Sequence, residues 1–289
     1  MAPIRRETAV GSARSRVRCM KRPDEDDWPQ GGEVDYTRHL RLFGRGTVDY
    51  HVHFDRVRYV VKARKGRTVV FDGMSAYVPK GRRVAILGAR RSGKTSLVKL
   101  IAGVAVPAAG EVRLNSRISW PVGGSYLVAP ALSVRDNVVF CANLLGVGAR
   151  AMLRYVDDIC MFGPKMHEVV RNLPKVYRTR LNYALPLVAN FDCFLVDGGL
   201  SLDRMRLPDD RVEWMRSQFL AKDMIVVTGK ARTAREWCDT GAAILDRHLV
   251  FCQSVEEAIG LVGDLEPDDE RHTPDEDDEE EEVDNNGFW

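Results

Sequence analysis

Short apolar runs alternate with longer amphipathic stretches along the middle of the chain. The apolar runs lie at residues 57–61, 68–71, 84–87, 111–114, 191–196, 224–228, 243–245 and 249–251. Short apolar runs bounded by turn residues are typical of buried strands. Amphipathic stretches at residues 96–101, 133–145, 149–172, 176–189, 208–221, 231–239 and 255–261 predict helices. Strands that alternate with helices indicate a mostly parallel sheet covered on both faces, and the last two runs predict an antiparallel hairpin at its edge.

The predicted elements divide the chain into three parts. Residues 1–53 have no periodic pattern and are predicted to form a basic, disordered arm and linker, which we favour over an organelle transit segment. Residues 54–263 carry the predicted domain, and a helical block at about 132–176 interrupts its alternation like an inserted subdomain. Ser133, with Asp136 three residues on, and Ser254 are predicted helix N-caps. Residues 264–289 form an acidic tail predicted to be disordered.

Charge is distributed unevenly along the 289 residues. The net charge is only +2, but residues 1–22 hold seven basic residues and residues 264–289 hold fourteen acidic ones. The body between these tails is therefore basic, which fits an anionic ligand or an anionic membrane surface. The six cysteines form no C-x-x-C pair or Cys/His cluster, so neither a zinc site nor a disulfide framework is indicated. No apolar run is long enough to span a bilayer.

One stretch carries a motif with a known physical role. The segment Gly88-Ala89-Arg90-Arg91-Ser92-Gly93-Lys94-Thr95 reads G-x-x-x-x-G-K-T, and it stands between a predicted strand and a predicted helix that starts at Ser96. In that context, backbone N–H groups and a helix N-terminus bind the phosphates of a nucleotide. Lys94 is predicted to contact the β- and γ-phosphates, and Thr95 to offer its hydroxyl to Mg²⁺. Residues 88–96 are therefore the predicted nucleotide-binding site.

Other polar residues have competing interpretations. Asp197 ends an apolar strand about a hundred residues after the loop, and we favour a role in holding Mg²⁺ with Thr95 over a plain strand-end acid. Arg90 and Arg91 could grip phosphate or form a solvated face. His51 and His53 precede the predicted domain and do not make a convincing metal pair. The acidic tail is interpreted as solvated, with an intramolecular role over the basic body as the sharper alternative.

Several later segments accompany the phosphate loop in a recognisable order. They are residues 118–121, 135–138, 191–197, 238–242, 248–250 and 254–259. Together with the loop and the helical block, they resemble the ATP-binding subunit of ABC transporters, and more narrowly its polysaccharide-export branch, the capsule and O-antigen exporters. The resemblance covers roughly residues 54–262. It implies an α/β P-loop NTPase fold with a mostly parallel sheet, an antiparallel β edge and an inserted helical subdomain, and it implies ATP and Mg²⁺ as ligands.

Four hydrolytic groups of that family have no counterpart in this chain. Gly198 stands where the family has a catalytic Glu, and Gly229 stands at the switch His. Ala129 replaces the Gln that senses Mg²⁺, and residues 174–177 replace the Ser-Gly-Gly-Gln signature. Loss of the water-orienting Glu alone is expected to lower the rate on the order of 10²–10⁴-fold. We therefore assign no catalytic residue and predict that ATP is bound but hydrolysed weakly or not at all. Tyr59 is the candidate for the aromatic that stacks on adenine.

The resemblance implies a cytoplasmic subunit, peripheral on the inner face of the inner membrane. Its expected partners are a membrane permease subunit and a second ABC ATP-binding subunit, in a homo- or heterodimer; no nucleic acid partner is expected. The alternative hypothesis is a non-transport regulatory or scaffold module that uses ATP only to set its conformation. A small-molecule kinase is a third hypothesis, which no acceptor site in the sequence supports. The sequence leaves the exported substrate open.

Overall fold

The computed structural model describes residues 49–63, 66–123, 126–189, 191–263 and 265–266. Its strands are β1 (Tyr50–Ala63), β2 (Gly66–Pro79), β3 (Arg83–Leu87), β4 (Ala109–Leu114), β5 (Cys193–Asp197), β6 (Asp223–Thr228), β7 (Thr240–Leu245) and β8 (His248–Phe251). Its α-helices are α3 (Lys94–Ile101), α4 (Val134–Leu145), α5 (Ala149–Cys160), α6 (Lys175–Val188), α7 (Asp209–Leu220), α8 (Ala231–Trp237) and α9 (Val255–Val262). Short 3-10 helices lie at η2 (Gly163–His167), η3 (Val170–Asn172) and η4 (Leu202–Met205).

The strands form two sheets. The larger has the order β5-β6-β3-β7-β8, in which the first four strands are parallel and β8 is an antiparallel edge. The smaller sheet, β2-β1-β4, is antiparallel. The predicted α/β fold with a mostly parallel sheet and an antiparallel edge is thus confirmed. The central place of β3 matters most, because it directs the phosphate loop to the middle of the sheet's carboxyl edge.

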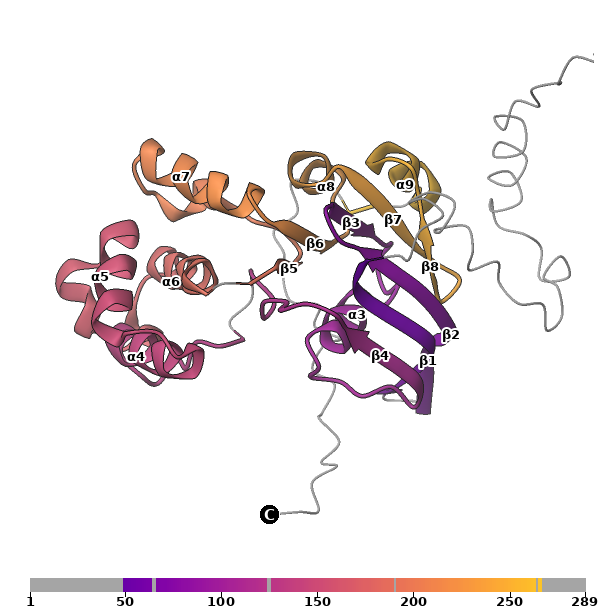
Figure 1. The fold of residues 1–289 in the computed structure, drawn as a ribbon, viewed down its shortest axis with the longest axis horizontal. Coiled ribbons are helices and arrows are strands. Elements are labelled where there is room, and N and C mark those ends of the chain that lie inside the picture. The colour runs from indigo at the N-terminus through magenta and orange to yellow at the C-terminus, as the bar shows by residue number, and fades with distance from the viewer. Residues whose placement is uncertain (1–48, 64–65, 124–125, 190, 264, 267–289) are drawn as a thin grey trace, which may run out of the picture.

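Alternate residues of the parallel strands are buried against different layers, which explains why these strands are apolar throughout. Phe194 and Val196 of β5 pack into a cluster that also contains side chains of α4, α5, α6 and α7. Leu195, between them in sequence, packs into a second cluster, with α3 and the smaller sheet. In Figure 1, α4, α5 and α6 gather on one side of the molecule, away from β1, β2 and β4. A third cluster, around Ala85 and Leu87 of β3, joins that strand to α8 and α9.

The predicted helix caps are confirmed at both serines. Ser133 Oγ accepts a hydrogen bond from Asp136 N at 3.0 Å, and Ser254 Oγ accepts one from Glu257 N at 3.2 Å. Such bonds satisfy backbone donors that have no partner within the helix, and each contributes about 1 kcal/mol. Local sequence chemistry therefore sets where α4 and α9 begin.

One predicted helix is wrong in length. The amphipathic stretch at residues 149–172 forms α5 only as far as Cys160, and the short helices η2 and η3 follow. Met161 takes a left-handed conformation with φ 54°, and Pro164 lies two residues after Phe162 at the start of η2. A left-handed residue ends an α-helix, and proline cannot donate the backbone bond that would continue it.

The predicted domain boundary at Phe54 is also too late. Strand β1 begins at Tyr50, so His51 and His53 lie within the sheet. His51 is 2% exposed and hydrogen-bonds to side chains from two other parts of the chain. At the other end, Leu265 and Glu266 are described, although the sequence places them in the acidic tail. The rest of the predicted arm (1–48) and tail (264 and 267–289) lies outside the described residues.

The cysteines that the structure describes are free, and all except the half-buried Cys238 are buried. Burial raises the pKa of the Cys141 thiol to about 11, so it behaves as a small apolar core residue.

Within the described residues, no helix has the length and apolar character needed to cross a membrane.

Candidate functional site: a phosphate loop facing a basic cleft

The phosphate loop connects β3 to α3. The four residues of β3 before the loop, Val84, Ala85, Ile86 and Leu87, are fully buried. Gly88 N then donates to Thr228 O of the neighbouring strand at 3.3 Å. Helix α3 starts at Lys94, with Gly93 as N-cap in a left-handed conformation with φ 97° and no side-chain cap. The first N–H groups of α3 are therefore not capped by a side chain, which suits an anion at this helix end.

Both glycines of the motif are required by close approach. A Cβ on Gly93 would overlap Val70 Cγ1 of β2, and a Cβ on Gly88 would overlap Ser92 Oγ. The positive φ of Gly93 also disfavours any other residue. Gly93 thus lets the loop pack closely against β2, and Gly88 lets the loop fold back on itself at Ser92.

Lys94 is held at the loop by backbone acceptors. Its Nζ donates to Gly88 O at 3.0 Å and to Ala89 O at 2.9 Å. Nζ also lies 2.9 Å from Glu266 Oε1. Ser92 Oγ is buried and has no hydrogen-bond partner among the described residues. A phosphate oxygen is a suitable partner for both groups, because it accepts from ammonium and hydroxyl donors alike.

Asp197 ends β5 and is held by its neighbours. Tyr126 Oη donates to Asp197 Oδ2 at 2.8 Å, and Asp197 N donates to Val122 O at 3.0 Å. Asp197 and Thr95 line the same cleft. No group of three or more His, Cys, Asp or Glu residues suited to a metal occurs in the described residues. One carboxylate and one hydroxyl nevertheless fit Mg²⁺, which takes its remaining ligands from water and nucleotide phosphates.

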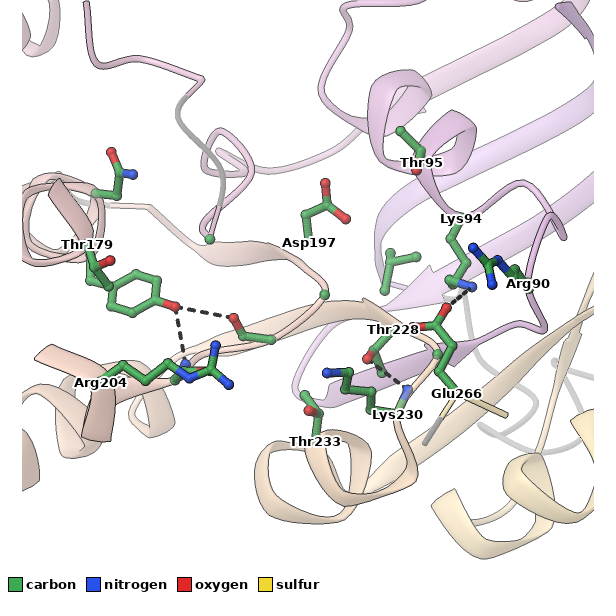
Figure 2. Close-up of a pocket in the computed structure, with 18 of the residues that line it drawn as sticks. Arg90, Lys94, Thr95, Thr179, Asp197, Arg204, Thr228, Lys230, Thr233 and Glu266 are labelled. Atoms are coloured by element: carbon green, nitrogen blue, oxygen red, sulfur yellow. Dashed lines mark hydrogen bonds and ion pairs between the residues drawn. The ribbon is translucent and has the colours of Figure 1, made fainter. Parts of the chain in front are cut away.

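The loop forms one wall of a cleft of about 270 Å³. In Figure 2, Lys94, Thr95 and Arg90 lie on one side, Thr179 and Arg204 on the other, and Asp197 between them. Five basic side chains and two acidic ones line the cleft: Arg90, Lys94, Lys175, Arg204 and Lys230, with Asp197 and Glu266. This excess of positive charge favours an anionic ligand.

Most of the opposite wall was not predicted from the sequence. It comes from α6 and from the residues around η4, and the segment after β6 lines the cleft between the two walls: Lys175, Thr179, Asn182, Tyr183, Ser201 and Arg204, then Lys230 and Thr233. Lys175, the first residue of α6, is one of these cleft residues. Only Lys230 has a sequence signal, because it follows a parallel strand at the carboxyl edge where ligands bind.

Tyr183 organises part of this wall. Its hydroxyl accepts a hydrogen bond from Ser201 N at 3.1 Å and lies 3.4 Å from Gly199 O, to which it donates. Burial raises the pKa of the Tyr183 hydroxyl. The group therefore stays protonated at neutral pH and keeps the turn after β5 in place.

The predicted site residues are distributed as follows. Arg90, Lys94 and Thr95 line the cleft with Asp197, and the carbonyl of Ala89 contacts Lys94. Arg91 lies at the tip of the loop with φ 62°, and Ser96 follows Thr95 in the first turn of α3. Gly198 and Gly229, which replace the family's Glu and His, both line the cleft. Tyr59 packs against the cluster between the two sheets.

Comparison with known proteins gives a consistent result. Residues 71–141 match the model of the ABC transporter family. The capsule polysaccharide export ATP-binding protein CtrD of Neisseria meningitidis is 26% identical over 202 residues, which cover 70% of this chain and 94% of that protein. The polysialic acid transport ATP-binding protein KpsT of Escherichia coli is 24% identical over 197 residues, covering 67% and 88% respectively. The solved dimer of an ATP-binding cassette bound to ADP and Pi has a TM-score of 0.55 at 16% identity, covering 68% of this chain and 96% of that one.

The fold is therefore that of an ABC-transporter ATP-binding domain. Within this class, the relatives confirm the resemblance of the chain to the ATP-binding proteins of polysaccharide export.

Proposed function

We propose that this protein is the ATP-binding subunit of an ABC-type polysaccharide-export transporter, and that it binds ATP with Mg²⁺ at residues 88–96 but hydrolyses it weakly or not at all. The main support for this proposal is that Lys94, on the phosphate loop, lies in one basic cleft with Thr95 and Asp197. Lys94 and the N-terminus of α3 bind the phosphates. Thr95 and Asp197 hold Mg²⁺, which when bound neutralises phosphate charge.

Weak hydrolysis is proposed from the groups that are missing. Gly198 follows Asp197 and Gly229 follows β6, and neither carries a group that can orient water or contact the γ-phosphate. Phosphoryl transfer depends on several positioned groups acting together, so the loss of two at one cleft lowers turnover steeply.

The proposal includes two partners and a location. A permease subunit would hold the protein at the inner face of the inner membrane, and a second ABC ATP-binding subunit would complete a homo- or heterodimer. The polysaccharide-export relatives named above support the membrane partner. The same missing groups also favour the second candidate, a regulatory or scaffold module that binds ATP without spending it. Co-purification with a candidate permease separates the two, because only the transporter subunit associates with a membrane partner.

Nucleotide binding is tested with the purified full chain. We expect ATP with Mg²⁺ to raise the melting temperature in a concentration-dependent way, because a ligand that binds only the folded state stabilises it. Lys94→Ala should weaken this effect by about tenfold in ATP concentration, because it removes a charge-assisted phosphate contact. Lys99→Ala is the matched control, since Lys99 lies on the same helix but does not line the cleft. An unchanged ATP response in Lys94→Ala would overturn the site.

A further inference from the structure

Glu266 lines the cleft and lies directly beside Lys94 (Figure 2). Its Oε1 atom is 2.9 Å from Lys94 Nζ, and the two side chains are 24% and 17% exposed. Lys94 also donates to the carbonyls of Gly88 and Ala89. An ammonium has three N–H donors, so these three acceptors account for all of them. A phosphate oxygen can therefore bind Lys94 only by replacing one acceptor.

Backbone contacts seat Glu266 independently of its charge. Glu266 N donates to Gly229 O at 2.9 Å. A Cβ on Gly229 would lie 2.5 Å from both Cδ and Oε1 of Glu266, so the missing side chain at position 229 leaves the room that Glu266 takes. Leu265 packs against the cluster that joins β3 to α8 and α9. The carboxylate is thus placed by a hydrogen bond, a glycine and an apolar contact.

We propose that Glu266 is an autoinhibitory residue, whose carboxylate competes with nucleotide phosphate for Lys94. The inference rests on the proposed nucleotide binding at the same loop and names its regulation. A carboxylate and a phosphate accept the same donors and repel each other, so only one of them occupies Lys94 at a time. Of the three acceptors on Lys94, Glu266 is the one that phosphate displaces. The carbonyls of Gly88 and Ala89 belong to the loop itself and stay in place.

This contact lowers the apparent affinity for nucleotide without changing the loop. Only molecules with Glu266 withdrawn are competent to bind, so the apparent Kd equals the intrinsic Kd divided by the competent fraction. Because Glu266 follows α9 within the same chain, its competition is intramolecular and does not depend on protein concentration. Gly229 makes this contact possible, because a residue without a side chain leaves room for the inhibitory carboxylate.

The test compares full-length variants by titration with a non-hydrolysable ATP analogue and Mg²⁺. Glu266→Gln keeps the shape of the side chain and removes its charge, and we expect the apparent Kd to fall by about fivefold. Gly229→Ala should tighten binding similarly, because its methyl group displaces Glu266. The double variant should bind no more tightly than either single one, since both release the same contact. Glu256→Gln is the matched control, because Glu256 pairs with Arg235 outside the cleft.

Melting temperature supplies a second measurement. Without nucleotide, Glu266→Gln should melt lower than the unmodified chain, because a partly buried ion pair is lost; with ATP its stabilisation should be larger. If the unmodified chain binds ATP through Lys94 and Glu266→Gln binds with the same Kd, the autoinhibition is overturned and the proposed function stands. If neither chain shows Lys94-dependent binding, both proposals fail. Loss of turnover in Glu266→Gln at an unchanged Kd would mark Glu266 as a catalytic carboxylate and would also overturn the inference.

Discussion

His51 and Asp223 are joined by a hydrogen bond of 2.8 Å between Nε2 and Oδ2, although 172 positions separate them in the chain. The other ring nitrogen of His51, Nδ1, lies 2.6 Å from Ser116 Oγ. Asp223 Oδ2 also accepts from Gly81 N at 2.7 Å. His51 belongs to β1 and Asp223 to β6, so this network ties the antiparallel sheet to the parallel one at a buried position.

We expect His51→Ala to lower the free energy of unfolding by about 2 kcal/mol, because it removes a buried ring and both of its hydrogen bonds to the half-buried Ser116 and Asp223. Urea unfolding followed by circular dichroism measures the change. His53→Ala is the control on the same strand: His53 is half-buried and stacks on Tyr77 at a centroid distance of 4.0 Å, so its loss should cost less. Equal costs for the two variants would contradict a special role for the His51 network.

Arg180 is a buried charge that connects three elements. From α6 it donates through Nη1 to Cys160 O at 2.9 Å, through Nε to Met205 O at 2.8 Å and through Nη2 to Arg206 O at 2.8 Å. Arg180→Ala should lower the free energy of unfolding by about 3 kcal/mol, because three carbonyls at the ends of α5 and η4 lose a charged donor. Lysine has no planar fork, so Arg180→Lys should recover only part of this loss.

The matched control for Arg180 is Arg178→Ala, since Arg178 is exposed on the same helix. A surface substitution of this kind should change stability by less than about 0.5 kcal/mol. Similar denaturation midpoints for the two variants would contradict the assignment of Arg180 as a structural connector.

The Tyr126 hydroxyl orients Asp197 through the 2.8 Å hydrogen bond. Removing a group that orients a metal ligand commonly lowers the affinity for the metal by about tenfold or more. We expect Tyr126→Phe to raise the Mg²⁺ concentration needed for half-maximal ATP stabilisation by about tenfold. Thermal melting with a Mg²⁺ titration at fixed ATP measures it. Asp197→Asn provides the reference for full loss, and binding of ATP without Mg²⁺ should be the same in all three proteins.

Gly198 adopts φ 80°, a conformation that other residues rarely take. A Cβ there would meet nothing within 4 Å, so the cost of a side chain comes from the backbone alone. Gly198→Ala and Gly198→Glu should therefore each lose about 1 kcal/mol of stability, measured by urea unfolding.

A comparison of Gly198→Ala with Gly198→Glu also distinguishes the effect of a changed backbone on ATP turnover from the effect of an added carboxylate. Gly198→Glu restores only one of the missing hydrolytic groups, so its turnover should remain within about tenfold of that of Gly198→Ala. Rapid turnover by the unmodified chain would contradict the proposal of weak hydrolysis.

Much of the fold follows from local sequence patterns. The buried runs predict most of the strands, because parallel strands covered on both faces need apolar residues at every position. Ser133 and Ser254 predict the starts of α4 and α9, because a cap depends on only three neighbouring residues. Gly163 and Pro164 are helix-breaking residues inside the stretch 149–172. The amphipathic pattern continues beyond them, so that pattern predicts one helix that is too long.

The sequence by itself determined the phosphate loop, since the motif, its strand and its helix are contiguous. It also determined that Asp197 ends a strand of the same sheet. Only the tertiary structure decided that α6 and η4 supply the opposite wall, that His51 meets Asp223, and that Glu266 reaches Lys94. These contacts join residues far apart in sequence, and they depend on strand order and helix packing, which no local periodicity encodes.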